Sequence, residues 1–166
     1  IVAAKRSPIG RANKGSLVGF RPDELAALLV QEALAAAPEL APERIEDLIL
    51  GCGLPGGEQG MNMARLVAVR LGFDFMPGTT VTRYCSSSLQ TTRMAFHAIK
   101  AGEGDVFLSA GVETVSRFGH GYADDPAALP ELVERLHRNV EGVAVERPEA
   151  LVDEQGVEGD AAGAGG

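Results

Sequence analysis

The sequence predicts an α/β fold, with a mixed and mostly parallel sheet and helices on both of its faces. Short apolar, β-prone runs alternate with longer segments of helical periodicity, which is the order expected of βαβ units. The chain has 166 residues, of which 45% are hydrophobic, and this is enough to form one ordinary core. Its 21 glycines and its aromatic content of only 5% suit a sheet protein with small side chains and tight turns.

The expected elements follow from the apolar spacing and from the positions of proline and glycine. Strands are expected at residues 1–4, 45–51, 79–82 and 105–110, and helices at residues 22 to about 38, 62–71 and 86–101. The first helix opens with Pro22, Asp23 and Glu24, because proline suits the first turn and acidic side chains there complement the helix dipole. Its expected apolar face consists of Leu25, Leu28, Leu29 and Ala33.

Charge is distributed unevenly along the chain. Residues 1–116 carry 12 acidic and 11 basic side chains, whereas residues 117–166 carry 11 acidic and 4 basic ones. Strand-like runs become scarce after Phe118, and the last residues are rich in glycine and alanine. We therefore expect three parts, namely a folded domain at 1–118, an acidic extension at 119–152 and a flexible tail at 153–166.

The composition disfavours several classes of function. A net charge of −8 without a polybasic segment disfavours nucleic-acid binding, because phosphate contacts depend on Lys and Arg. No apolar run is long enough to predict a membrane span, and the first residues do not have the pattern of a secretion signal. Cys52 and Cys85 form no CxxC or Cys/His cluster, so neither a disulfide framework nor a metal site is expected. We expect a cytoplasmic protein.

Cys85 stands where a β-prone run turns into a helical pattern, and this makes it a candidate nucleophile. Leu89, Phe96 and Ile99 follow at near-helical spacing, so we expect Cys85 at the N-terminus of a largely buried helix. Unpaired amides and the positive end of the helix dipole favour a thiolate there, and the same amides can stabilise an oxyanion. The local pattern is equally compatible with an inert buried cysteine.

The segment around Cys85 resembles a known family. Residues 81–91 (VTRYCSSSLQT) resemble the nucleophile motif of the thiolases, the acyl-CoA acetyltransferases. Further motifs of that family recur in order. Residues 1–10 (IVAAKRSPIG) resemble its first strand and loop, residues 60–65 (GMNMAR) its Gly-Asn-Ala-Arg signature, and residues 111–116 (GVETVS) its segment after the fourth strand. The resemblance covers roughly residues 1–118 and implies the N-terminal half of the thiolase fold.

The resemblance implies ping-pong acyl transfer with Cys85 as the catalytic nucleophile. An acyl-CoA acylates the thiol and releases CoA, and the acyl group then passes to a second CoA thioester; the reverse reaction is thiolysis of a 3-ketoacyl-CoA. CoA thioesters are then substrates, as in fatty acid metabolism, with no bound cofactor. Because thiolase relatives pair through a sheet edge, we expect a homo-oligomer, a dimer or a tetramer, with contacts at residues 79–84.

The sequence also departs from the thiolase pattern. Ser88 stands where most thiolases have Gly, and the run Cys-Ser-Ser-Ser-Leu resembles ketoacyl synthases as well, so a ketoacyl-synthase-like condensing enzyme is one alternative. The family's Gly-His-Pro histidine and its second cysteine have no match, since His97, His120 and His137 lie outside such a motif. A truncated fragment or a non-catalytic thiolase-like subunit is therefore the other alternative.

A glycine pattern elsewhere resembles a dinucleotide site only weakly. Residues 51–56 (GCGLPG) read G-x-G-x-x-G after an expected strand. Pro55 and the turn at 57–60 keep a helix from starting at the glycines, as a pyrophosphate site requires. We expect these glycines to form a tight turn beside the catalytic loop.

Four polar or small residues near these motifs also need an interpretation. Cys52 is expected to be a small residue at a strand end, and Glu113 to be structural. Asn62 and Arg65 either open a helix or order the catalytic loop or a dimer contact, and the sequence leaves both roles open.

Overall fold

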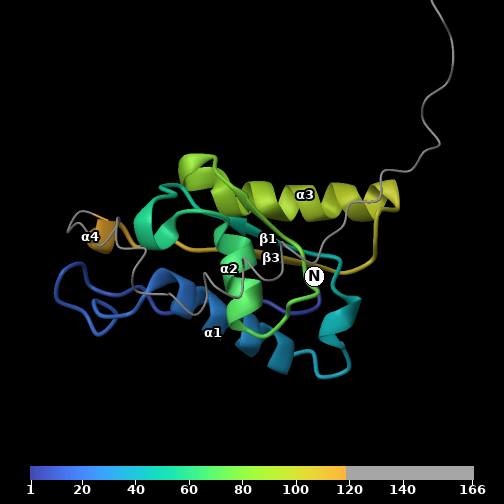
Figure 1. The fold of residues 1–166 in the computed structure, drawn as a ribbon, viewed down its shortest axis with the longest axis horizontal. Helices are drawn as coiled ribbons and strands as arrows, with labels where there is room; N and C mark the ends of the chain where they lie inside the picture. The colour runs from blue at the N-terminus through green and yellow to red at the C-terminus, as the bar shows by residue number, and fades with distance from the viewer. Residues whose placement is uncertain (119–166) are drawn as a thin grey trace, which may run out of the picture.

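The computed structural model describes residues 1–118, which form a three-layered α/β arrangement (Figure 1). Its sheet consists of β1 (Asp47–Gly51), β2 (Gly78–Val81) and β3 (Phe107–Gly111), in the order β2-β1-β3. Both strand pairs are parallel. Figure 1 shows α3 along one face of the sheet and α1 and α2 on the other, so the predicted fold class is confirmed.

The helices connect the strands in the order expected of βαβ units. They are α1 (Pro22–Ala35), α2 (Met63–Arg70), α3 (Ser87–Ala101) and the short α4 (Val115–Phe118). The chain runs from β1 through α2 to β2, and then through α3 to β3 on the far side of β1. These two crossovers run in opposite directions across the sheet, so the preference for right-handed connections places α2 and α3 on opposite faces.

The hydrophobic core lies between the sheet and the helices α1 and α2. Leu48 and Leu50 of β1 are fully buried, and they share a cluster with Met63 and Val67 of α2. Asn62 caps α2, because its side-chain oxygen accepts from the backbone N–H of Arg65 at 3.3 Å. The core therefore packs against one face of the sheet. The loops that follow β1 and β3 lie at the carboxyl ends of these strands.

The expected apolar face of α1 is wrong. Leu28 is 43% exposed, and the buried stripe consists instead of Asp23, Ala26, Ala27 and Val30. These residues have the i, i+3, i+4, i+7 spacing of one helix face. The first position of this stripe is a carboxylate, so the apolar spacing in the sequence does not indicate it. Asp23 faces inward because Arg21 and Arg70 pair with it at 3.0 and 3.3 Å.

The expected strand at residues 1–4 is also absent from the described sheet. Ile1 and Val2 are 107% and 89% exposed, and the sheet holds only β1, β2 and β3. An apolar run becomes a strand only where a neighbouring strand satisfies its backbone groups. Within residues 1–118, no backbone hydrogen bond joins residues 1–4 to such a neighbour.

Candidate active site

Cys85 lies in a 3₁₀ turn, Tyr84–Ser86, that leads directly into α3 at Ser87. Its side chain is exposed. It borders a pocket of about 440 Å³ at the carboxyl ends of β1 and β3. The pocket is lined by Gly51, Gly53, Leu54, Tyr84, Cys85, Ser87, Ser88, Gly111, Val112, Glu113 and Val115. The expected place of Cys85 at the start of a helix is therefore confirmed.

The expectation that this helix is largely buried is wrong. Its buried residues are Ser87, Thr91 and Ala95, whereas the apolar residues of the sequence pattern are exposed, Leu89 at 74%, Phe96 at 54% and Ile99 at 46%. These small and polar residues form the face of α3 that meets the sheet. The Thr91 hydroxyl lies 2.9 Å from the hydroxyl of Ser109 on β3. Small side chains allow α3 to lie close to the strands, and its apolar stripe faces away from them.

Glycines at the ends of β1 and β3 let the first turn of α3 rest on the sheet. A Cβ on Gly51 would lie 2.6 Å from the backbone of Ser87 and Ser88, and a Cβ on Gly111 would overlap the Ser88 hydroxyl. In the next loop, a Cβ on Gly53 would lie 3.1 Å from the carbonyl oxygen of Tyr84. The lack of side chains at these positions therefore sets the height of the turn that carries Cys85 above the sheet.

The second cysteine is in a contrasting environment. Cys52 is 0% exposed, and its Sγ lies 3.9 Å from Oε1 of Glu113. Burial, with a smaller contribution from the negative charge of Glu113, raises the pKa of the Cys52 thiol to about 11. Cys52 is therefore a protonated, inaccessible thiol at neutral pH. This agrees with its interpretation as a small residue at a strand end.

Glu113 joins the loops that follow β1 and β3. Its carboxylate accepts from the backbone N–H of Gly53 at 2.6 Å and from the side-chain amide of Gln59 at 3.1 Å. Gln59 is 2% exposed, and its Oε1 accepts from the backbone N–H and the hydroxyl of Thr114 at 2.7 and 2.9 Å. Sequence reasoning did not identify Gln59, because a single glutamine in a glycine-rich loop gives no local signal.

Comparison with known proteins gives the same assignment as the motifs. Residues 1–153 match the family described as "Thiolase, N-terminal domain". The chain belongs to the thiolase family. A 3-ketoacyl-CoA thiolase of Bacillus subtilis is 43% identical over 118 residues, which are 70% of this chain and 30% of that relative. A beta-ketoadipyl-CoA thiolase of Escherichia coli is 44% identical over 113 residues, which are 68% of this chain and 28% of the relative.

Solved structures support the same conclusion. The crystal structure of the Bacillus anthracis acetyl-CoA acetyltransferase matches with a TM-score of 0.64 and 37% identity, over 70% of this chain and 29% of that one. The fold described above is therefore that of a thiolase N-terminal domain. This thiolase chain spans only about 30% of the length of the curated relatives that it matches.

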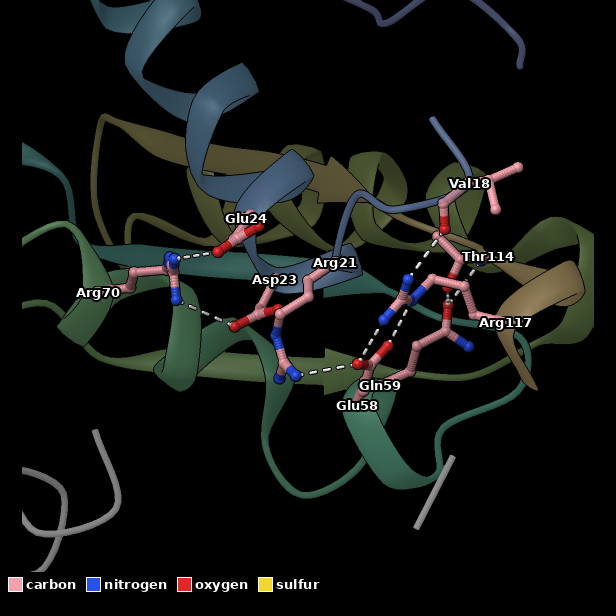
Figure 2. A network of polar contacts seen from close by, with 9 residues as sticks. All are labelled: Val18, Arg21, Asp23, Glu24, Glu58, Gln59, Arg70, Thr114 and Arg117. Carbon is pink, nitrogen blue, oxygen red and sulfur yellow. Dashed lines mark hydrogen bonds and ion pairs between the residues drawn. The ribbon is translucent and has the colours of Figure 1, made fainter. Parts of the chain in front are cut away.

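A network of ion pairs supports the pocket loops of this thiolase chain (Figure 2). Glu58 accepts from Nε and Nη2 of Arg117 at 2.6 and 2.7 Å and from Arg21 at 2.9 Å. Arg21 in turn pairs with the buried Asp23, which Arg70 also contacts. The network ties the start of α1 to the loop after β1 and to α4. No local pattern in the sequence had indicated it.

Asn62 and Arg65 have structural roles in the described residues. Besides capping α2, the Asn62 amide donates to the Gly78 carbonyl oxygen at 2.6 Å and so joins α2 to the start of β2. The Arg65 guanidinium donates to the carbonyl oxygens of Met76 at 2.6 Å and Asp74 at 2.9 Å. Asn62 therefore opens a helix, which is one of the two roles left open. Both residues also order the loop before β2, which neither alternative had named.

The weak dinucleotide pattern does not have the geometry of a dinucleotide site. A 3₁₀ turn at Gly57–Gln59 follows the glycines, and α2 begins only at Met63. A dinucleotide site needs the helix that follows the glycines in sequence to begin directly at them, and α2 does not. Gly51 and Gly53 line the pocket beside Cys85 instead.

The single histidine within residues 1–118 does not lie where it could act as a base for Cys85. His97 is exposed on α3, twelve residues beyond Cys85, which corresponds to about 18 Å along a helix axis. His120 and His137 lie outside the described residues. Within residues 1–118, no three His, Cys, Asp or Glu side chains are grouped so that they could hold a metal ion. No helix in that part has the length and apolar character needed to cross a membrane.

Proposed function

We propose that Cys85 is the nucleophile of an acyl-CoA acyltransferase and that this chain carries the acyl-enzyme half of a thiolase reaction. The observation that carries the proposal is the contrast between the two thiols. Cys85 is exposed at the pocket and at the start of α3, whereas Cys52 is buried and remains protonated at neutral pH. Relatives named 3-ketoacyl-CoA thiolase and acetyl-CoA acetyltransferase support the choice of CoA thioesters as substrates.

The chemistry follows from the position of the thiol. The Cys85 thiolate attacks the carbonyl carbon of an acyl-CoA, and a new C–S bond forms while negative charge develops on the carbonyl oxygen. The positive end of the α3 dipole faces this turn and favours the negative charge that develops on the carbonyl oxygen. Collapse of the intermediate breaks the bond to the CoA sulfur, and CoA leaves as a thiolate that takes up a proton. The acyl group remains on Cys85.

The second half of the reaction needs a proton acceptor. Condensation requires that a proton leave the carbon of the second CoA thioester, and the described residues place no histidine near Cys85. Loss of a general acid or base typically costs about 10²–10⁴-fold in rate. We therefore propose that these 166 residues alone accept an acyl group but turn over slowly.

Labelling with acetyl-CoA followed by peptide mass spectrometry tests this proposal. An acetyl group should appear on the peptide that contains Cys85. It should be lost in Cys85→Ala and retained in Cys52→Ala, which is the matched control because it removes the other thiol. Steady-state thiolysis of acetoacetyl-CoA should be low. Acetylation of Cys52 instead, or no acetylation of the folded chain, would contradict the assignment of Cys85.

A non-catalytic thiolase-like subunit is the second candidate function. The observation that favours it is that, within residues 1–118, no histidine lies near Cys85. In that case the chain binds a partner and Cys85 is an ordinary exposed thiol. The labelling experiment separates the two candidates, because an ordinary thiol does not become acetylated faster than a free thiol in solution.

We propose a homo-oligomer that forms through residues 79–84, and the position of β2 at the edge of the described sheet supports this. We also propose a cytoplasmic protein of fatty acid metabolism, with a folded domain at 1–118. The proposed acidic extension at 119–152 and tail at 153–166 lie outside the described residues.

A further inference from the structure

The Ser87 hydroxyl binds two backbone groups at the N-terminal side of the turn that contains Cys85. Its Oγ accepts from the N–H of Arg83 at 2.8 Å and donates to the carbonyl oxygen of Tyr84 at 2.7 Å. Ser87 is only 4% exposed, so water does not compete for these bonds. The hydroxyl therefore closes the turn from inside the protein.

Tyr84 has a backbone conformation that needs such support. Its φ of +49° lies in the left-handed region, which L-residues other than glycine, asparagine and aspartate rarely adopt. The Tyr84 residue is 75% exposed, so packing of the ring contributes little to holding this conformation. The buried hydroxyl of Ser87 is the side-chain group that binds the Tyr84 backbone directly.

The glycines of β1 and its loop support the turn from the other side. A Cβ on Gly53 would lie 3.1 Å from the Tyr84 carbonyl oxygen, and a Cβ on Gly51 would lie 2.9 Å from the Ser87 Cβ. The turn thus lies against the backbone of β1 and its loop, while the Ser87 hydroxyl ties the start of the turn to the first residue of α3. This combination fixes the direction in which the side chain of the next residue, Cys85, projects from the backbone.

We propose that Ser87 is a positioning residue for acyl transfer, because its hydroxyl holds Tyr84 in the left-handed conformation and thereby aims the Cys85 thiol into the pocket. The inference rests on the proposed function of Cys85 as the nucleophile. Ser87 acts through the backbone of Tyr84 and not on the substrate. Its loss should therefore slow acylation, which depends on the direction of the thiol, more than a reaction with a small unguided electrophile.

The test compares acetylation by acetyl-CoA with alkylation by iodoacetamide in the full chain. In Ser87→Ala we expect acetylation of Cys85 to be about tenfold slower, while alkylation of Cys85 changes less than about twofold. The buried Cys52 reports on the fold, because it becomes alkylated only if the protein opens. Ser86→Ala is the matched control, since the Ser86 side chain makes no capping bond, and it should leave both rates unchanged.

A second background isolates the role of the turn. Asparagine tolerates the left-handed region, so in Tyr84→Asn the turn needs less support and Ser87→Ala should slow acetylation less than about threefold. If Ser87→Ala alone exposes Cys52, Tyr84→Val and Tyr84→Asn are compared with Ser87 intact. Both variants lack the ring, and acetylation should be several-fold slower in Tyr84→Val than in Tyr84→Asn, because a β-branched residue resists this conformation.

The outcomes separate this inference from the proposed function. A parent chain that acetyl-CoA does not acetylate at Cys85 overturns both. If the parent is acetylated and Ser87→Ala leaves its rate the same, the positioning role alone is overturned. The same holds if Ser87→Ala reduces the rate equally in the parent and in the Tyr84→Asn background. Equal rates in Tyr84→Val and Tyr84→Asn also overturn it.

Discussion

The hydroxyl of Ser88 occupies the space that a Cβ on Gly111 would fill. Ser88 lies in the first turn of α3 and Gly111 ends β3, so the pair determines how closely the helix that follows Cys85 approaches the sheet. Gly51 at the end of β1 has a similar role, but the two atoms nearest to it belong to the backbone of Ser87 and Ser88. This difference predicts which substitutions can be compensated.

Gly111→Ala should destabilise the protein by about 1–3 kcal/mol, because the new methyl group displaces the first turn of α3. The double variant Gly111→Ala/Ser88→Gly should recover most of that stability, since the nearest remaining atom is the Gly51 carbonyl oxygen at 3.5 Å. Gly51→Ala is the matched control, and Ser88→Gly should not rescue it. Thermal unfolding measures all four variants. Equal rescue of both alanine variants would show that α3 adjusts as a whole.

Glu58 and Glu24 both pair with arginine but differ in exposure. The Glu58 side chain is 7% exposed and binds Arg117 and Arg21, whereas that of Glu24 is 38% exposed and binds Arg70. Glu58→Gln should therefore cost about 2–3 kcal/mol, because Arg117 and Arg21 each lose one buried carboxylate partner. Glu24→Gln should cost less than about 1 kcal/mol. Urea unfolding measures both, and similar costs would contradict the importance of burial in this network.

Cys52 makes stability depend on alkaline pH. Its pKa is raised to about 11 in the folded protein from an ordinary value of 9.0, so the unfolded chain loses the proton first. This contribution is fully present below pH 9 and falls as pH rises from 9 towards 11, by up to about 3 kcal/mol. The fall should be absent in Cys52→Ala. Urea unfolding at several pH values gives the two slopes, and parallel slopes would contradict the raised pKa of Cys52.

The proposed oligomer predicts that the open edge at β2 is an interface. Thr79→Lys places a charge on this edge, and it should shift light scattering at micromolar concentration towards monomer. Gln31→Lys adds the same charge at an exposed position of α1 and should leave the oligomer intact. A parent chain that is already a well-behaved monomer would contradict the proposal, as would an equal effect of both lysines.

Much of the fold follows from patterns that are local in the sequence. The alternation of β-prone and helical segments predicted the parallel sheet with helices on both faces, and it placed Cys85 at the start of α3. These features depend on backbone preferences and spacing within a few residues, which the sequence displays directly. The thiolase motifs, which recur in order, then identified the family that the comparisons confirm.

Which faces are buried, and which residues support the pocket, depended on contacts between distant parts of the chain. Gln59 binds Thr114, which is 55 positions away, and Glu113 binds Gly53, which is 60 positions away. The inward position of Asp23 depends on Arg70, 47 positions away. A local pattern shows that such a side chain is polar but not whether a partner reaches it, and burial of a charge is favourable only when one does. The sequence by itself determined most of the helices and strands and the position of Cys85 at the start of α3. Tertiary structure decided the orientation of the helices and the polar contacts around the pocket, because these depend on partners that only folding brings together.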